Sequence, residues 1–290
     1  MLRLAHGHWA RWPDGIQPFE LGHWEKAALL QRSLGPNIAV SHLSAGKLWG
    51  LPLSTGMTWV HGLLGEPPAT PRHDLRPHLA FASGRRNQDA GGYVLHRGLG
   101  LEPVQGLWGC DVTSALETLL ALQPVLPGWR GVTVVDFLLA HGLSMGRREP
   151  LTTARFGELL EQVPAGTPGL RSVKRALTRA SERMWSPMET VLRLLVEDAG
   201  FPRPLGNVEV MLPDRSAAYI DLAWPEQMVG LEYNGSVHYQ NAQAYDEEMH
   251  RLNQLEECGW AVRTVVVNDL KLPTRLSSMF AWLDLHLKRR

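Results

Sequence analysis

The stretch that most constrains this chain is Ile220–Gly235, which reads Ile-Asp-Leu-Ala-Trp-Pro-Glu-Gln-Met-Val-Gly-Leu-Glu-Tyr-Asn-Gly. Apolar and polar residues alternate on both sides of the Pro225-Glu226 step, and this period of two is typical of half-buried strands. The pattern predicts two antiparallel strands joined by a turn at Pro225-Glu226. One carboxylate, Asp221 or Glu232, interrupts the apolar pattern in each strand.

If the connecting loop has an even number of residues, antiparallel pairing places Asp221 and Glu232 on the same face of the sheet. Their Cβ atoms would then be about 5 Å apart when directly opposite, or about 7–8 Å apart when diagonal. Like charges at that separation repel each other unless a cation lies between them. Mg²⁺ suits this place, because proteins usually hold it with one or two carboxylates together with phosphate and water. The alternative is an ordinary solvated face of a sheet.

Length and composition indicate a globular protein with more than one domain. The chain has 290 residues, of which 44% are hydrophobic and 20% are charged. It contains no apolar run of the roughly 18 residues that a membrane-spanning helix needs, and no apolar segment of a secretory signal near its start. Cys110 and Cys258 lie far apart and form no Cys-x-x-Cys pair. We therefore expect a cytoplasmic protein with free thiols and no membrane partner.

The pattern of elements predicts three segments. Residues 1–110, with short strands and short helices, predict an α+β domain similar to a winged helix, and residues 111–185 predict a helical connecting region. Residues 186–290 predict an α/β domain in the order α-β-β-β-α-β-α, with a mixed sheet flanked by helices. The helix between the strands at Leu231 and Val265 requires at least one parallel pair.

Charge is distributed unevenly, although the net charge is zero. Residues 1–185 carry 19 Lys and Arg against 14 Asp and Glu, a net charge of +5, which leaves 10 against 15, or −5, for residues 186–290. Any attraction for nucleic acid should therefore come mainly from the first part of the chain.

The segment Leu170–Trp185 reads as one amphipathic helix with a basic ridge. The ridge consists of Arg171, Arg175, Arg179 and Arg183, spaced every four residues, with Lys174 beside them. Such a ridge is typical of a track for a phosphate backbone, and a solvated helix face is the alternative.

Ser186-Pro-Met-Glu189 has the pattern of a capping box at the start of a helix, with Ser186 at the N-cap and Glu189 at the third helical position. In that role the Glu189 carboxylate folds back onto the Ser186 N–H, which competes with a role in a metal site.

Several motifs follow one another in residues 186–290, and others occur earlier in the chain. They are Ser186–Glu189 with Arg193, Gly200–Pro204, Ile220–Pro225, Leu231–Gly235 with His238, Asp246, Arg251, Leu255 and Gly259-Trp260, and, earlier, Val40–Ala45, Leu48–Leu53 and Val112–Leu119. The first set resembles the Vsr-like (very-short-patch-repair) branch of the PD-(D/E)XK nucleases, and more closely an uncharacterised, mainly actinobacterial group of Vsr-related domains. The earlier set resembles the winged-helix region of AbiEi-like antitoxins.

The resemblance implies a restriction-endonuclease-like domain that acts as a Mg²⁺- or Mn²⁺-dependent DNA endonuclease in repair, defence or mobile-element biology. Asp221, Glu232 and the backbone carbonyl of Tyr233 would ligate the cation. The cation would activate a water molecule and stabilise charge on the scissile phosphate.

The resemblance also implies roles for three further side chains. Glu189 would complete the acidic cluster or orient the water. His238 would lie near the phosphate or the leaving group, and Arg251 would stabilise the negative charge of the pentavalent phosphate.

Asn234 departs from the family pattern, which commonly has Lys two residues after the Glu, or Asp in this branch. An amide can act neither as a cation nor as a base, so we expect Asn234 to lower the catalytic rate but to leave metal binding intact. It favours an alternative function, in which an inactive nuclease fold serves as a DNA-binding or antitoxin-like regulator. DNA is the expected partner in both cases, and a homodimer suits double-strand cleavage.

Overall fold

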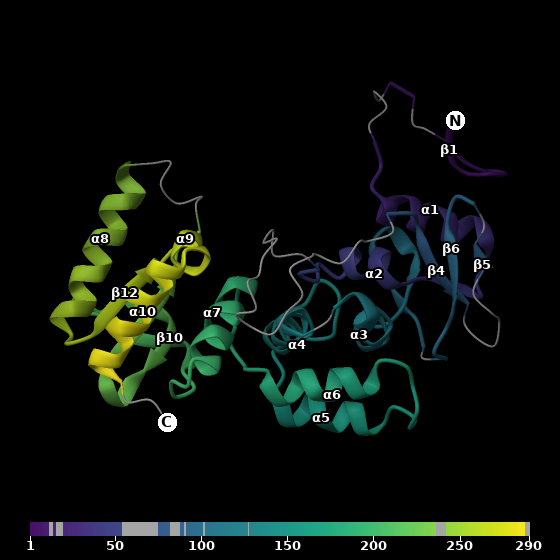
Figure 1. Ribbon diagram of the computed structural model, residues 1–290. Helices are drawn as coiled ribbons and strands as arrows, with labels where there is room; N and C mark the ends of the chain where they lie inside the picture. The colour runs from purple at the N-terminus through teal and green to yellow at the C-terminus, as the bar shows by residue number, and fades with distance from the viewer. Residues whose placement is uncertain are drawn as a thin grey trace. The chain divides into compact units, whose positions relative to one another are not determined.

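The computed structural model describes residues 1–11, 14–15, 20–53, 75–81, 88–89, 91–100, 102–126, 128–235 and 242–287, with residues 242–245 described by their backbone alone (Figure 1). These residues fall into two compact units, one ending at Ala180 and the other beginning at Ser181. Both are α+β, with helices flanking a mixed sheet. Across the described ranges, no helix has the length and apolar character needed to cross a membrane. The division at residue 110 stays a prediction.

The first unit combines a β-ribbon, a larger sheet and a set of helices. Its elements are β1 (Leu2–Ala5), β2 (His8–Ala10), α1 (His23–Leu34), β3 (Ile38–Val40), α2 (His42–Leu48), β4 (His78–Phe81), β5 (Gln88–Asp89), β6 (Val94–Arg97), β7 (Val104–Gln105), the 3-10 helix η1 (Leu107–Gly109), β8 (Asp111–Val112), α3 (Ala115–Leu122), the 3-10 helix η2 (Gln123–Val125), α4 (Trp129–His141), α5 (Thr153–Glu161) and α6 (Leu170–Arg179). Strands β1 and β2 are antiparallel, and the larger sheet has the order β5-β6-β4-β3-β8-β7. Its β3–β8 and β4–β6 pairs are parallel.

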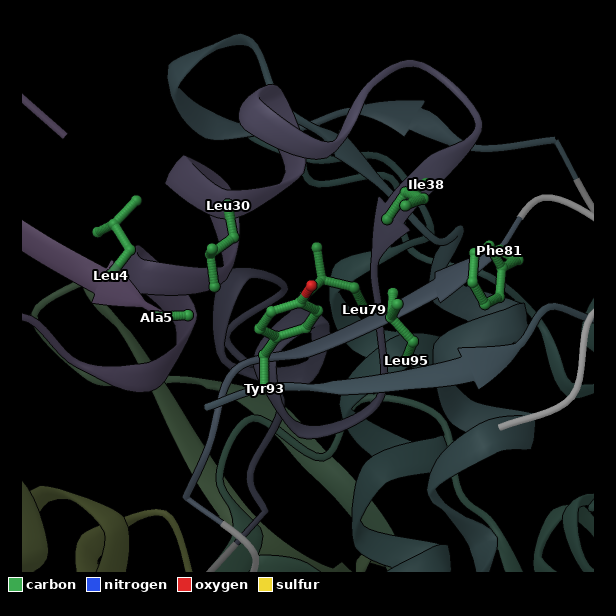
Figure 2. Close-up of a cluster of buried hydrophobic side chains, with 8 residues drawn as sticks. All are labelled: Leu4, Ala5, Leu30, Ile38, Leu79, Phe81, Tyr93 and Leu95. Carbon is green, nitrogen blue, oxygen red and sulfur yellow. The ribbon is translucent and has the colours of Figure 1, made fainter. Parts of the chain in front are cut away.

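Two groups of buried apolar side chains hold this unit together. Figure 2 shows the first group, in which side chains from β1, α1, β3, β4 and the start of β6 meet; it consists of Leu4, Ala5, Leu30, Ile38, Leu79, Phe81, Tyr93 and Leu95. The second group joins α1 and α2 to β3 and β8 through Ala27, Ala28, Val40, Ala45 and Val112, among others. Helix α1 contributes to both groups, and β3 is buried along its whole length because it has neighbours on both sides.

The turn that leads into α6 depends on two glycines. Gly166 and Gly169 have φ values of +83° and +84°, a left-handed conformation that other residues adopt only with strain. A Cβ atom at Gly169 would also lie 2.2 Å from the carbonyl oxygen of Leu120 in α3, whereas a Cβ at Gly166 would meet nothing within 4 Å. Gly169 therefore allows the turn to approach the backbone of α3.

These two glycines predict different stability losses. Gly166→Ala should cost about 1–2 kcal/mol of unfolding free energy, because its only penalty is the left-handed backbone. Gly169→Ala should cost at least about 1–3 kcal/mol more, because the methyl group also collides with Leu120. Urea denaturation of both full-length variants measures the difference. Equal losses would contradict the requirement for close approach to α3.

The second unit is built around the hairpin expected from the sequence. Its elements are α7 (Pro187–Asp198), β9 (Leu205–Met211), β10 (Ala217–Trp224), the 3-10 helix η3 (Pro225–Gln227), β11 (Val229–Tyr233), α8 (Ala242–Glu257), β12 (Ala261–Val265), α9 (Val267–Lys271) and α10 (Pro273–His286). The sheet has the order β12-β11-β10-β9, and its β11–β12 pair is parallel, as the intervening helix requires. The short helix α9 is an addition to the predicted order.

The predicted antiparallel hairpin is confirmed. Leu222 pairs with Leu231 and Trp224 with Val229, so the loop has four residues, 225–228, which is an even number. Met228 closes this loop with φ 54°. Leu255 of α8 packs against β9 and β10, while α7 contacts β10 and β11. The helices thereby hold the hairpin inside the unit.

The single helix predicted over Leu170–Trp185 is wrong in its second half. Helix α6 ends at Arg179, where Ala180 takes an extended backbone, and Arg183 has φ 61°. Tertiary contacts explain the difference, because the guanidinium of Arg183 donates to the carbonyl of Asn207 and the Asn207 amide donates back to the carbonyl of Arg183. This reciprocal pair fixes the chain in a turn that helical periodicity does not reveal.

Candidate functional site

Asp221 and Glu232 lie at the end of the β10–β11 pairing. The last residues in register are Leu222 and Leu231, and one further step places Asp221 opposite Glu232 on the same face of the sheet. Oδ2 of Asp221 accepts a hydrogen bond of 2.8 Å from the backbone N–H of Tyr233. The Asp221 side chain is therefore fixed on the backbone of β11 beside Glu232.

Arg251 of α8 holds Glu232 with a two-pronged ion pair. Its Nη1 and Nη2 donate to Oε1 and Oε2 of Glu232 at 2.8 Å and 2.6 Å. The same guanidinium also contacts Glu248, with Nε donating to Oε2 at 3.1 Å and Nη2 to Oε1 at 2.8 Å. These hydrogen bonds, led by those to Glu232, raise the pKa of Arg251, so it stays a cation. Both oxygens of Glu232 are occupied by this cation.

Glu189 enters from the start of α7, where Ser186 caps the helix as predicted. Oγ of Ser186 accepts from the Glu189 N–H at 3.2 Å. The carboxylate of Glu189 accepts from the Trp185 N–H at 2.8 Å and from Nδ2 of Asn207 at 2.6 Å. Glu189 is only 6% exposed, and its burial raises its pKa, against the opposing effect of these hydrogen bonds. Glu189 thus supports the helix start while its charged group stays inside the unit.

The charges of Glu189 and Glu232 both act on Asp221. Burial is the largest cause that raises the pKa of Asp221 from 3.8 to about 7, and repulsion from Glu189 is the next. Glu232 adds to the rise, whereas the Tyr233 N–H and Arg251 oppose it. We call Glu189, Asp221 and Glu232 the acidic cluster, because the charges of Glu189 and Glu232 are close enough to Asp221 to raise its pKa.

The acidic cluster predicts a loss of stability with rising pH. Asp221 binds its proton more tightly in the folded chain than in the unfolded chain, so its contribution is present below pH 3.8 and is lost as the pH rises towards about 7. Between pH 5 and pH 8 the titration of Asp221 should lower the free energy of unfolding of the wild-type protein by about 2–3 kcal/mol. Asp221→Asn has no carboxyl group to titrate, so its free energy of unfolding should not show this part of the fall. Denaturant titrations at both pH values measure the difference.

Glu226→Gln is a matched control for this experiment, because Glu226 is exposed in the loop of the same hairpin. Its stability should follow that of wild type at both pH values. An Asp221→Asn protein with the wild-type pH dependence would show that Asp221 titrates normally.

The structure places the remaining predicted site residues as follows. The N–H of Asn234 donates to the carbonyl of Val265 at 2.9 Å, which extends the β11–β12 ladder. Its side-chain oxygen Oδ1 is buried and has no hydrogen-bond partner within the described part of the chain. Tyr233 gives its N–H to Asp221, and its carbonyl stays a predicted ligand. His238 lies outside the described residues.

Asn207 and Glu248 are site residues that the sequence analysis missed. Asn207, on β9, is 1% exposed and donates from Nδ2 to both Glu189 and the Arg183 carbonyl, so it positions the Glu189 carboxylate. The sequence did contain a signal for Asn207, because it is a polar residue in a strand whose neighbouring positions are apolar. Glu248 precedes Arg251 by three residues, and this spacing on a helix was the signal for its contact.

The basic ridge is shorter than predicted. Arg171, Lys174, Arg175 and Arg179 lie on α6, in the first unit. Arg171 and Arg175 are exposed, whereas Lys174 forms an ion pair of 2.7 Å with Glu161 of α5. Arg183 does not belong to the ridge, because it follows the end of α6 and contacts β9 of the second unit.

Comparison with known proteins supplies no named function. Two uncharacterised proteins of Mycobacterium tuberculosis, one from strain CDC 1551 / Oshkosh and one from strain ATCC 25618 / H37Rv, are each 27% identical to this chain over 195 residues. The match covers 65% of this chain and 72% of each relative. No family model and no solved structure matches the chain. The chain is thus similar to these two mycobacterial proteins, whose names state no activity.

Proposed function

We propose that this protein is a Mg²⁺- or Mn²⁺-dependent DNA endonuclease that hydrolyses phosphodiester bonds. Its active site would be the acidic cluster in the second unit, which would have a Vsr-like, restriction-endonuclease-like fold. The observation that carries the proposal is the convergence of Glu189, Asp221 and Glu232 from α7, β10 and β11. Burial, together with the charges of Glu189 and Glu232, raises the pKa of Asp221 to about 7. Repelling carboxylates kept together on rigid elements are typical of a cation site.

The donor atoms around the cluster fit a hard divalent cation in their chemistry. Mg²⁺ and Mn²⁺ prefer oxygen ligands, and Asp221 and Glu232 supply carboxylates while Asn234 has a buried oxygen without a partner within the described residues. The arrangement around Glu232 is at present that of an ion pair. Accordingly, no group of three or more His, Cys, Asp and Glu in the described ranges is arranged to hold a metal. Binding therefore requires Arg251 to release Glu232.

Glu248 makes such a release feasible. Arg251 already uses Nε and Nη2 to bind Glu248, so it can leave Glu232 and keep a charged partner. A divalent cation bound to Asp221 and Glu232 would supply an activated water and neutralise charge on the scissile phosphate. Arg251, held by Glu248, would then be available to bind a phosphate oxygen, and Glu189, held by Asn207, would orient the water.

DNA would be attracted chiefly by the first unit. The exposed guanidinium groups of Arg171 and Arg175 lie on α6, one turn apart, and suit contacts with successive phosphates. This part of the chain carries the positive charge, so it would supply affinity that the acidic second unit lacks.

A plasmid assay tests the nuclease proposal. Wild-type protein should nick or linearise supercoiled plasmid with Mg²⁺ or Mn²⁺, and Glu232→Gln should lower the rate at least about 100-fold, because several kcal/mol of transition-state stabilisation are lost. Glu257→Gln, at the exposed end of α8, is the matched control and should cut normally. Absence of cutting by wild type, or equal cutting by wild type and Glu232→Gln, would refute the proposal.

A second candidate function is a catalytically inactive nuclease fold that serves as a DNA-binding, antitoxin-like regulator. The ion pair favours this candidate, because Arg251 already compensates the charge of Glu232 without a metal. Asn234 favours it as well, since an amide lacks the charge of the Lys or Asp that the resembling nucleases have there.

Metal titration separates the two candidates. If Arg251 competes with the cation, Arg251→Met should bind Mn²⁺ at least about tenfold more tightly than wild type in calorimetry, because the guanidinium no longer has to be displaced. Arg275→Met, on the exposed side of α10, is the matched control and should keep the wild-type affinity. Lack of Mn²⁺ binding by both wild type and Arg251→Met would favour the regulator.

A further inference from the structure

The first unit contains a pocket of about 660 Å³ that uses none of the residues of the acidic cluster. Its wall is formed by the start of α2, by β4 and β6, by α3 and by the turn between α5 and α6. Its size is that of pockets that bind small organic ligands. The apolar part of the wall consists of Ala80, Leu99, Leu120, Ala121, Pro124 and Pro168.

A stacked pair of histidine rings, with a third histidine beside it, reaches this pocket. The rings of His42 and His96, which line it, have centroids 3.5 Å apart at an interplanar angle of 16°. The ring of His78 lies beside His96 in nearly the same plane, with centroids 5.0 Å apart and an interplanar angle of 8°, and its Nδ1 is 2.8 Å from Nε2 of His96. A hydrogen bond between two imidazole nitrogens requires one nitrogen to lack a proton. Because the rings of His42 and His96 are nearly parallel, the pair presents a flat aromatic surface.

His42 is held in a strained conformation at the pocket. Its φ is 48°, which is uncommon for a residue other than glycine, and Oγ of Ser41 lies 2.9 Å from its Nδ1. Burial and the neighbouring His96 and His78 lower the pKa of His42 to about 2, so its ring is uncharged. Its other ring nitrogen, Nε2, has no hydrogen bond to any described residue and remains for a ligand.

Glu117 of α3 adds a strong acceptor to the same pocket. The residue is 4% exposed, and its Oε1 accepts from the Leu99 N–H at 2.9 Å. Within the described residues, Oε2 makes no hydrogen bond. Oε2 is not one of the fully buried atoms that lack a partner, so a ligand in the pocket can reach it and donate an N–H to it.

These three features select one chemical class of ligand. A flat ring stacks on the histidines, apolar walls cover its edges, and Glu117 accepts from an amino group. Arg97 also lines the pocket but already interacts with another group of the protein, so an anion would still be repelled by Glu117. An aliphatic ammonium group would leave most of the apolar wall uncovered. We propose that this pocket binds a nucleobase with an exocyclic amino group, namely adenine, guanine or cytosine. The amino group donates to Glu117, and the ring lies against the His42–His96 stack.

Calorimetric titration of the full-length protein with single nucleosides tests this site. Adenosine, guanosine or cytidine should bind at least about tenfold more tightly than thymidine and uridine. The base of these two lacks the amino group, and its only donor, N3–H, lies between two carbonyl oxygens that the Glu117 carboxylate repels. Failure of all amino-bearing nucleosides to bind at millimolar concentration, or equal binding of thymidine, would overturn the proposal. The outcome does not depend on nuclease activity, because the acidic cluster lies in the other unit.

Two variants test the contacts. Glu117→Gln keeps the size of the side chain but replaces one acceptor oxygen with an NH2 group and removes the charge. It should weaken the binding of the amino-bearing nucleosides about tenfold. His42→Asn removes the stacking ring while placing at φ 48° a residue that tolerates this conformation, and it should weaken every nucleoside. His6→Asn, at an exposed turn in the same unit, is the matched control and should bind as wild type. Unchanged affinity in both pocket variants, in protein with wild-type thermal stability, would place the nucleoside elsewhere.

The base could come from a free nucleoside or from single-stranded DNA. A short single-stranded oligonucleotide and the same strand with one abasic position separate these sources. Tighter binding of the base-bearing strand than of the free nucleoside assigns the pocket to DNA, and the reverse assigns it to a metabolite; both support recognition of the base. Equal binding of the base-bearing and abasic strands, with no binding of nucleosides, would overturn it.

Discussion

The arrangement of the acidic cluster depends on the ion pair between Arg251 and Glu232. The two side chains are 27% and 7% exposed, so little water screens their charges and they attract each other strongly. The same burial makes each charge costly if it loses its partner. Without the guanidinium, Glu232 would add an uncompensated charge beside Asp221 and Glu189. Arg251 therefore occupies the electrostatic role that a metal ion would have in the proposed nuclease, and release of this pair is the step on which metal binding depends.

Regular secondary structure positions the cluster. The N-terminal turn of α7 is capped by Ser186, so Glu189 begins from a fixed backbone, and Asn207 of β9 holds its carboxylate. The Tyr233 N–H holds Asp221, because the side chain of Asp221 takes a hydrogen bond where the β10–β11 register ends. Groups supported in this way lose little further freedom when they bind a ligand, which favours a binding role for the cluster.

In the first unit, the buried polar side chains of the pocket make contact through stacked rings and hydrogen bonds, unlike the ion pair of the acidic cluster. The rings of His42 and His96 are stacked, and His78 lies beside His96 and shares with it a hydrogen bond between two imidazole nitrogens. Nearby, Glu117 has one oxygen bound to the backbone and the other without a donor among the described residues. The second unit thus compensates charge with charge, whereas the first presents an aromatic surface and a single acceptor. This difference is the basis for proposing a cation at one site and a neutral heterocycle at the other.

Local patterns in the sequence determined the hairpin and the helix start. Alternation around Ile220–Gly235 predicted both strands, because side chains on a strand repeat every two residues. It predicted a shared face for Asp221 and Glu232 on the condition that the connecting loop has an even number of residues. The helix between β11 and β12 likewise required the parallel pair. Tertiary contacts alone decided that Arg251 binds Glu232, and that α6 stops at Arg179.

Tertiary structure also brought together histidines that lie 36 and 18 positions apart in the sequence, at 42, 78 and 96. Each of these contacts joins residues on different elements, namely α2, β4 and β6, so no periodicity within one helix or strand can predict it. A sequence pattern therefore reports which face of its own element a residue occupies, while the partner it meets there is decided by how distant elements pack.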